Sequence, residues 1–398
     1  MMVRVGFVFE FLEPGWLGGF SYYRNLLGAL RSLPGRRIET VIFTGRRIDA
    51  NRLAEFPAAD IVHSSFLDAR DPLCILRKLW VLATARDIFL ERLLTRSRID
   101  ILSHSGYLGH RAKIPAVGWI PDFQYKYFPE YFSPLQRTLR HLKYRRMCEL
   151  CACVLLSSVA AKKDLERFIP DRRAASRVIR FVPSIPNDPA PSKREEIARR
   201  FGFSGPYFLV PNQFWAHKNH PVLIEALRIL KSQGRMVLVL ATGSTTDGRK
   251  PGYFSSLMAS AQRSGVLDCF RVLGIVPYRD LVGLMRNAVS LINPSLFEGW
   301  STTVEEAKAL GKRIILSDIP VHREQDPERG VYFPPDDPHL LAQAMWQLWL
   351  SDDPGLDEVM FARQQETTAV RIAHFAKSYE EAILGVLAKD LPQAGETL

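Results

Sequence analysis

Apolar and polar positions follow two alternating patterns along this chain. Short, nearly continuous apolar runs, such as Val3 to Phe9, are followed by stretches in which apolar residues recur every three or four positions, such as about Ser21 to Leu33. Runs of the first kind are typical of buried strands, and stretches of the second kind are typical of amphipathic helices. The alternation continues to about residue 333, so the sequence predicts strand–helix–strand units and parallel sheets covered by helices.

In the first half, the apolar runs predict six strands. They lie at Val3–Phe9, Ile38–Thr44, Asp100–His104, Ala116–Ile120, Cys151–Ser158 and Val178–Val182. Helices are expected at about 21–33, 73–94 and 134–150, and another begins near Lys162. Residues 45–70 have no clear pattern.

The second half begins after a segment rich in proline. Four prolines lie between Pro183 and Pro191, which is typical of a linker. Strands are then expected at 207–210, 236–241, 269–274, 288–294, 313–316 and 331–333, with helices at 221–232 and 304–310. We therefore predict an α/β protein of two doubly wound Rossmann-like domains, 1–185 and 186–371, followed by a helix that begins near Ile372.

The stretch Ser295–Gly311 contains the most informative local pattern. A strand ending near Pro294 leads into a polar loop, and a helix is expected from Val304 to Leu310, with Gly311 just beyond its end. Either Thr302 with Glu305, or Thr303 with Glu306, has the spacing of a capping box. Unpaired amides at the positive end of a helix dipole favour phosphate binding.

Two carboxylates, Glu298 and Glu306, bracket these amides. The sequence E-G-W-S-T-T-V-E-E-A-K-A-L-G resembles the E-x7-E signature of retaining glycosyltransferases of family 4, whose common form is E-G-F-G-L-P-x-L-E-A-x-A-x-G. It keeps both glutamates but has Ser-Thr-Thr in place of Gly-Leu-Pro. The bland alternative is a helix with two solvated glutamates.

The resemblance implies the GT-B fold, in which two Rossmann-like domains face each other across a cleft. It places Glu298 beside the donor sugar and Glu306 at the ribose hydroxyls. The remaining donor-binding positions in this stretch are Gly299, Ser301, Thr302 and Thr303. In the family, the C-terminal helix, here about 372–390, packs back on the N-terminal domain.

Lys218 lies in a loop before a helix, where its charge could meet a diphosphate. The family usually has an arginine five residues earlier, and here Gln213 occupies that position and offers only hydrogen bonds. Gly274 and Ile275 resemble the family's edge that holds the nucleobase. An ordinary surface lysine is the alternative for Lys218, although Phe214, Trp215 and His217 in the same loop argue against that.

Three positions in the first half also resemble the family. The segment Pro121 to Ser133 resembles H-D-x(5)-F-P-E-Y-F-S, so Asp122 matches the family aspartate while Pro121 replaces the histidine. The resemblance gives Asp122 a catalytic role, and its alternative is to cap the turn after Pro121. Gly18 and Gly19 are expected in a loop before a helix. The resemblance implies that this loop borders the cleft for donor and acceptor, and the alternative is an ordinary pair of turn glycines.

Composition limits the partners. The net charge of +11 over 398 residues indicates an anionic partner, and the hydrophobic content of 47 % is ordinary for a soluble protein. Stretches 73–98 and 134–150 mix leucines and aromatics with arginines. They fit either helices on an anionic membrane surface or, as we expect instead, core helices with a solvated face.

The five cysteines do not suggest a disulfide framework, and Cys148, Cys151 and Cys153 are expected to be buried thiols rather than metal ligands. No apolar stretch is long enough to span a bilayer, and the N-terminus does not resemble a signal peptide. We therefore expect a cytoplasmic protein, which would be peripheral on the inner face of the membrane if it binds anionic lipid.

Together, these features predict a retaining hexosyltransferase, for example one resembling a mannosyltransferase. It would use a UDP- or GDP-sugar as substrate, require no metal or other cofactor, bind no nucleic acid, and act on a glycan or lipid-linked acceptor in surface polysaccharide synthesis. Two alternatives remain open: a nucleotide-sugar epimerase or hydrolase of the same fold, and a basic polyanion-binding protein.

Overall fold

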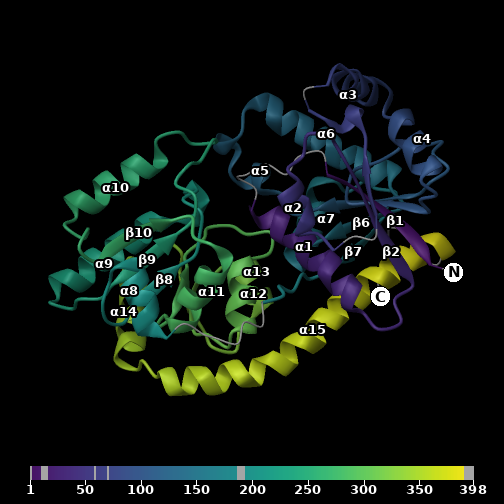
Figure 1. Ribbon diagram of the computed structural model, residues 1–398. Helices are drawn as coiled ribbons and strands as arrows, with labels where there is room; N and C mark the ends of the chain where they lie inside the picture. Colours follow the sequence, from purple (N-terminus) through teal and green to yellow (C-terminus); the bar gives the residue numbers. More distant parts are fainter. Residues whose placement is uncertain (1, 10–16, 58–59, 70, 186–192, 390–398) are drawn as a thin grey trace. The chain divides into compact units, whose positions relative to one another are not determined.

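The computed structural model describes residues 2–9, 17–57, 60–69, 71–185 and 193–389 (Figure 1). The chain divides into two compact units. One unit contains Met1–Ser184 together with Val370–Leu398, and the other contains Ile185–Ala369. Most of the predicted linker, 186–192, lies outside the described residues.

The first unit is built on a seven-stranded parallel sheet. Its strands are β1 (Val3–Phe9), β2 (Ile38–Thr44), β3 (Asp60–His63), β4 (Ile101–Ser103), β5 (Ala116–Ile120), β6 (Cys153–Leu156) and β7 (Ala175–Val178). They lie in the order β3-β2-β1-β4-β5-β6-β7, so the winding reverses between β1 and β4. This is a doubly wound sheet, as the sequence predicts.

The helical segments of the first unit connect these strands. They are α1 (Leu17–Ser32), α2 (Ala50–Ala54), η1 (Ser65–Leu67), α3 (Pro72–Thr84), α4 (Ile88–Arg96), α5 (Gln124–Tyr127), η2 (Pro129–Tyr131), α6 (Pro134–Leu150) and α7 (Val159–Phe168). Residues of α4, α6 and α7 pack on one face of the sheet, against Val41 and Val154 among others. All five cysteines are buried and free.

The second unit has a six-stranded parallel sheet in the order β10-β9-β8-β11-β12-β13. Its strands are β8 (Phe208–Val210), β9 (Val239–Thr242), β10 (Phe270–Gly274), β11 (Leu291–Asn293), β12 (Ile314–Ser317) and β13 (Gly330–Phe333). Because side chains alternate across a strand, Phe208 and Val210 face one core while Leu209 faces the other. Burial on both faces explains the continuous apolar runs.

Helices cover both faces of this second sheet. They are α8 (Arg194–Phe201), α9 (His220–Ser232), α10 (Tyr253–Arg263), α11 (Tyr278–Asn287), α12 (Thr302–Ala309), α13 (Pro320–Gln325), α14 (Pro338–Leu350) and α15 (Pro354–Ala388), with the short turn η3 (Ala216–Lys218). Residues of α9, α10 and α14 fill one core, and residues of α8, α11 and α12 fill the other. The α/β class and the doubly wound topology are therefore confirmed in both units.

The prediction of one long helix over 73–94 is wrong, because the structure has two helices there, α3 and α4. Ala85 adopts a left-handed conformation, with φ of 54°, and ends α3. The Asp87 carboxylate then caps α4 by accepting from the Leu90 amide at 3.0 Å. Asp87 also forms a buried ion pair with Arg77 at 2.7 Å. The break is therefore held by charge and capping, which apolar spacing does not reveal.

The expectation that the 73–94 stretch packs its leucines in the core is also wrong for α3. Its buried residues are Cys74 and Arg77. The large apolar side chains exposed on α3 are Leu73, Ile75, Leu76, Leu79, Trp80 and Leu82, with exposed fractions of 43–59 %. In α4, by contrast, Leu90 and Leu94 are buried.

Other element boundaries differ from the sequence predictions. Strand β7 ends at Val178, where the sequence predicted a strand to begin. Strand β3 falls in the stretch that showed no pattern, and only one of its residues is even partly buried. Helix α15 begins at Pro354, well before the predicted start near Ile372.

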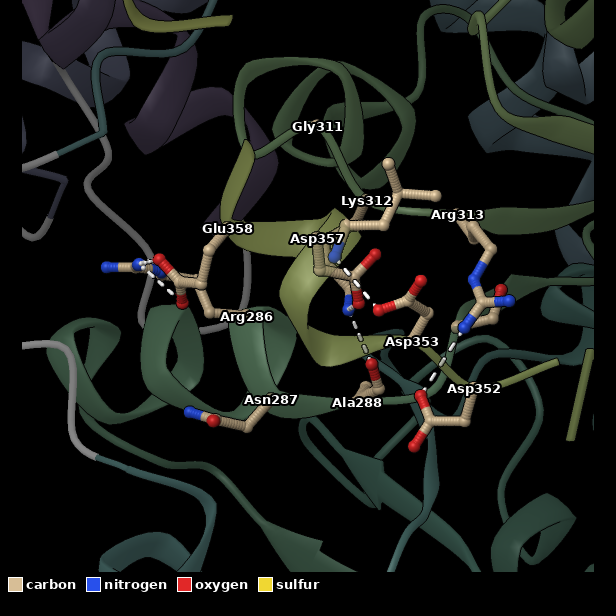
Figure 2. A network of polar contacts seen from close by, with 12 residues as sticks. Arg286, Asn287, Ala288, Gly311, Lys312, Arg313, Asp352, Asp353, Asp357 and Glu358 are labelled. Atoms are coloured by element: carbon tan, nitrogen blue, oxygen red, sulfur yellow. Dashed lines mark hydrogen bonds and ion pairs between the residues drawn. The ribbon is translucent and has the colours of Figure 1, made fainter. Parts of the chain in front are cut away.

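The first turn of α15 is anchored within the second unit by a buried polar network (Figure 2). Lys312 Nζ donates to the Ala288 carbonyl and pairs with Asp357, which also pairs with Arg329 Nη1 at 2.7 Å. Burial lowers the pKa of Lys312 to about 8, although Asp357 opposes the shift. A Cβ on Gly311 would lie 2.6 Å from the Met360 backbone, so only glycine allows α15 to pack this closely.

The last part of α15 packs within the first unit. The Tyr379 hydroxyl donates to Ser103 Oγ at 2.7 Å, and Glu380 accepts from the Arg37 backbone amide. Phe375 and Tyr379 are both fully buried. This segment of α15 is thus an integral part of the first unit's core.

Candidate functional site

The donor-site residues predicted in the second half of the chain gather at one end of the second sheet. Strands β8 and β11 are neighbours, and the strand order reverses between them. In doubly wound sheets, ligands bind at the carboxyl ends of the strands at such a reversal. The loops that leave β8 and β11 contain Lys218 and Glu298, respectively.

Lys218 and Glu298 form an ion pair there. Lys218 Nζ lies 2.6 Å from Glu298 Oε1, and only 12 % and 10 % of the two side chains are exposed. The loops are joined by a hydrogen bond of 2.8 Å from the Leu296 amide to the His217 carbonyl. Asn219 adds a second link, donating to the Pro294 carbonyl at 3.2 Å.

The surroundings keep Glu298 ionised. Burial opposes ionisation, but the charge and hydrogen bond of Lys218 outweigh it, and the pKa of Glu298 is lowered to about 2. The carboxylate is therefore negative throughout the physiological range. A charged, nearly buried pair at a ligand-binding edge is typical of a functional site.

Two buried histidines beside this pair were not predicted from the sequence. Burial lowers the pKa of His217 and of His322, so both are neutral near pH 7. His322 Nδ1 lies 2.8 Å from the Ser317 carbonyl, which can only accept, so Nδ1 carries the proton. His322 Nε2 is then an acceptor, and it has no partner among the described residues. Its position in α13 follows no motif, so the sequence gave no signal for it.

The helix N-terminus forms as predicted, but with a different cap. Ser301 is the N-cap of α12 and accepts from the Val304 amide at 3.4 Å. Both predicted capping boxes are wrong, because the helix begins at Thr302 and the residue three positions after the cap is Val304. Asn293 donates to Ser301 Oγ at 2.7 Å and thereby connects the cap to β11. The amides of Thr302 and Thr303 have no acceptor within the helix.

The two adjacent glutamates of α12 have different environments. Glu305 is fully buried and accepts from Gln325 Nε2 at 3.0 Å, so it is structural. Glu306 is 5 % exposed and accepts from the Tyr278 hydroxyl at 3.0 Å. Tyr278 begins α11, so this bond joins α12 to the segment after β10.

That segment contains the predicted nucleobase edge. Gly274 has φ of +73°, which favours glycine, and its carbonyl accepts from the Gly243 amide at 2.8 Å. Ile275 is 67 % exposed and therefore offers an apolar surface to solvent. Gly299 lies half-buried in the loop between Glu298 and the cap.

Gln213, also after β8, uses its side-chain oxygen within the protein. Gln213 Oε1 accepts from the Ser244 amide at 3.3 Å. Thr303 Oγ1 donates to the neighbouring Asn212 Oδ1 at 3.2 Å. The loops after β8, β9 and β11 are thus linked by hydrogen bonds at the same edge.

The three site residues predicted in the first half belong to the first unit. Gly18 and Gly19 lie in the first turn of α1, so their prediction as loop residues is wrong; loop residues 10–16 lie outside the described residues. Asp122 Oδ1 accepts from the Gln124 amide at 2.9 Å, which is the turn-capping contact considered as its alternative. Its catalytic role stays a prediction.

The first unit has a buried polar cluster at its own reversal of strand order. His104 follows β4 in a left-handed conformation, with Tyr22 Oη 2.8 Å from Nε2 and Ser103 Oγ 2.7 Å from Nδ1. Tyr22 stacks on Trp119 at 4.3 Å. Burial lowers the pKa of His104 to about 3, so the ring is neutral. The apolar pattern of the sequence predicted His104 only as the end of a strand.

Two features are absent from the described residues. None of the described helices is long and apolar enough to cross a membrane. Within the same part of the chain, no cluster of three or more histidine, cysteine, aspartate or glutamate side chains is arranged to hold a metal ion.

Part of the chain resembles known sequences. Residues 205–351 match the family model described as glycosyl transferases group 1. A stretch of 131 residues is 30 % identical to the O-antigen chain mannosyltransferase RfbU of Salmonella typhimurium strain LT2. That match covers 33 % of this chain and 35 % of the relative, so it spans about a third of the relative's length.

Solved structures resemble the whole chain. Anabaena Alr3699/HepE in complex with UDP-glucose has a TM-score of 0.67 at 16 % identity, covering 96 % of this chain and 99 % of that one. WaaG, a glycosyltransferase involved in lipopolysaccharide biosynthesis, has a TM-score of 0.61 at 15 % identity, with coverage of 96 % and 99 %. At these identities the likeness shows the fold, a chain of two Rossmann-like units of the GT-B class.

Proposed function

We propose that this chain, whose residues 205–351 match the family model of glycosyl transferases group 1, is a retaining glycosyltransferase. It transfers a hexose from a nucleotide-diphospho-sugar to a glycan or lipid-linked acceptor in surface polysaccharide synthesis. The observation that carries this proposal is the ion pair between Lys218 and Glu298 at the reversal of strand order.

The site has separate groups for each part of such a donor. Lys218 and the amides of Thr302 and Thr303 suit the diphosphate, because they combine a point charge with the positive end of a helix. Glu298 suits a sugar hydroxyl, since its ionised carboxylate only accepts. Glu306 suits the ribose hydroxyls. On donor binding, its carboxylate would accept hydrogen bonds from these hydroxyls in place of the one from Tyr278.

The proposed chemistry is a front-face displacement. The bond from the anomeric carbon to the leaving phosphate oxygen breaks as the acceptor oxygen bonds to the same face, and the acceptor proton passes to the leaving phosphate. Lys218 and the helix amides stabilise the charge that develops on the diphosphate. This reaction needs no side chain as general base.

UDP- and GDP-sugars are the first donors to test. The Salmonella relative is named a mannosyltransferase, and the Anabaena structure contains UDP-glucose. Thermal-shift measurements with UDP-, GDP-, dTDP- and ADP-sugars should show one nucleotide that raises the melting temperature most. No shift with any of them would contradict donor binding.

The same donors discriminate transfer from hydrolysis or epimerisation. A transferase releases the nucleoside diphosphate much faster with an acceptor glycan than without one, and NMR of the product should show retained anomeric configuration. Release at an equal rate without acceptor would instead favour the hydrolase. Conversion to an isomeric nucleotide-sugar would favour the epimerase.

We further propose that α3 holds the enzyme at an anionic membrane surface, where a lipid-linked acceptor is available. Six large apolar side chains of α3 are exposed, and Lys78 is exposed on the same helix. Arg146 of basic helix α6 donates to the Leu82 carbonyl at 2.9 Å, so α6 lies against α3. Each basic residue near anionic lipid contributes about 1 kcal/mol.

Co-sedimentation with liposomes tests this placement. Vesicles with anionic lipid should bind the protein at low salt and release it at high salt, and neutral vesicles should not bind it. The double variant Leu76→Glu/Leu79→Glu should stay in the supernatant. Leu350→Glu, which changes an exposed leucine of the second unit, should bind as wild type does. Equal binding by all variants would contradict a role for α3.

A further inference from the structure

We propose that Arg249 supplies the second cation that binds the donor diphosphate, in place of the arginine absent at position 213. This inference rests on the proposed function. The family resemblance leads one to expect two cations, five residues apart, in the loop after β8. This chain has only Lys218 there, so a neighbouring element must provide the other charge.

Arg249 lies in the loop after β9, the strand next to β8. Its Nε donates to Asp247 Oδ1 at 3.1 Å, and its guanidinium lies 4.6 Å from the centre of the Trp215 ring. Asp247 is buried, and its other oxygen accepts from the Ala216 amide at 3.3 Å. Asp247 and Trp215 therefore fix Arg249 against the loop that contains Lys218.

Gln213 helps to hold the Arg249 loop in place. Its side-chain oxygen accepts from the Ser244 amide, and Phe214 donates its own amide to the Ser244 carbonyl at 2.9 Å. Gly243 has φ of +126°, and a Cβ there would lie 2.6 Å from the Asn212 carbonyl oxygen. Arginine has no acceptor atom, so it could not make the bond that Gln213 makes. Having glutamine instead of arginine at position 213 thus removes one cation from the loop after β8. It also anchors the loop after β9, which contains Arg249.

Geometry places both cations near His217, which directly precedes Lys218 and whose ring lies 5.7 Å from the Trp215 ring that Arg249 contacts. Burial is the largest cause of the lowered pKa of His217, and both Lys218 and Arg249 lower it further. The Arg249 side chain is 24 % exposed, so a ligand can reach it without rearrangement of the core. Because Nε donates to Asp247 and Nη2 is buried, the permanent positive charge of the guanidinium is what Arg249 offers to a phosphate beside Lys218.

Calorimetric titration with UDP and GDP tests this role. For whichever nucleotide binds wild type, Arg249→Ala should weaken binding about 10-fold to 100-fold, as for loss of a charge-assisted hydrogen bond. Arg249→Lys should weaken it less. The matched control is Arg235→Ala, because Arg235 stacks on Trp346 at 5.1 Å but precedes β9 and lies at the other end of the sheet. The Arg235→Ala variant should bind the nucleotide with the same affinity as wild type.

A rescue variant separates phosphate binding from loop support. Adding Gln213→Arg to Arg249→Ala should recover much of the lost affinity, because it restores a cation at the family position. An unchanged melting temperature would show that Arg249→Ala is folded, and Arg249→Gln provides a second neutral variant. Wild-type affinity in both neutral variants, or no recovery in the double variant, would overturn the inference. If wild type bound neither nucleotide, the proposed function would fail as well.

Discussion

Lys218 Nζ lies 2.6 Å from Glu298 Oε1, so two of the three predicted catalytic charges neutralise each other in this structure. A nucleotide-sugar would have to change that arrangement. Its diphosphate competes with Glu298 for the lysine, and its sugar hydroxyls then give the carboxylate new donors. Donor binding and site activation are thereby coupled through one ion pair.

Replacing either partner should abolish most transfer. We expect Glu298→Ala and Lys218→Ala each to lower the rate on the order of 10²-fold or more, because one preorganised electrostatic contact to the reacting donor is lost. Both variants should remain folded, with a lower melting temperature because the remaining charge stays nearly buried without its counter-ion. The control is Glu225→Ala, which breaks an exposed pair with Arg228 on α9 and should leave the rate unchanged. A wild-type rate for Glu298→Ala would mean that the site is wrongly assigned.

Acid should destabilise the protein below about pH 6.5. Burial lowers the pKa of four histidines, namely His104, His217, His220 and His322. Below the unfolded pKa of 6.5, the folded state therefore binds fewer protons than the unfolded state. The free energy of unfolding then decreases as the pH is lowered. Each such histidine contributes about 1.4 kcal/mol per pH unit, down to its folded pKa.

Melting temperatures between pH 7.5 and 5 test this slope. His220 has both ring nitrogens buried without a partner among the described residues, and it stacks on Phe214 at 4.5 Å. His220→Phe should therefore retain stability at pH 7.5 and reduce the loss at pH 5. A variant whose stability falls as steeply as that of wild type would argue against this histidine as a contributor.

Asp357 should be essential for the stability of the second unit. Asp357→Ala leaves Lys312 and Arg329 without their shared buried anion, and we expect a loss of about 3–5 kcal/mol in the free energy of unfolding. The neighbouring Glu358 pairs with Arg286 at the surface, with its own side chain 65 % exposed (Figure 2). Glu358→Ala should cost about 0–1 kcal/mol. Equal losses from the two variants, measured by denaturant unfolding, would contradict this contrast.

Donor binding should not require a divalent metal. Lys218 and the amides of α12 take the role that a cation has in other sites, so calorimetric titration with the cognate nucleotide should give the same affinity in EDTA as in magnesium. If EDTA abolished binding, the diphosphate would depend on a bound cation instead.

The sequence predicted the positions of the strands better than the points at which helices begin and end. Buried parallel strands have continuous apolar runs, so β5 and the second-unit strands were found within a few residues. Strand β3 is largely exposed and has no such signal. The break at Ala85 depends on Asp87 and its ion pair with Arg77, which are ten residues apart in sequence and in contact only after folding.

The candidate site was predictable only where a local motif exists. Glu298, Glu306 and Lys218 belong to short stretches with recognisable spacing. His322 and Gln325 reach the same region from α13, and Arg249 reaches it from the loop after β9. No spacing along the chain connects these residues with the motif, because tertiary packing brings them together. The wrong capping boxes have a local cause, since Ser301, Thr302 and Thr303 are all acceptable caps and Asn293 selects Ser301.

The most direct test of the proposed function is calorimetric titration of wild type and Lys218→Ala with UDP- and GDP-sugars. The account predicts that wild type binds one of these donors and that Lys218→Ala binds it at least about 10-fold more weakly, through loss of a charge-assisted contact to the diphosphate. Equal affinity of the two proteins, or no binding of either donor by wild type, would contradict it.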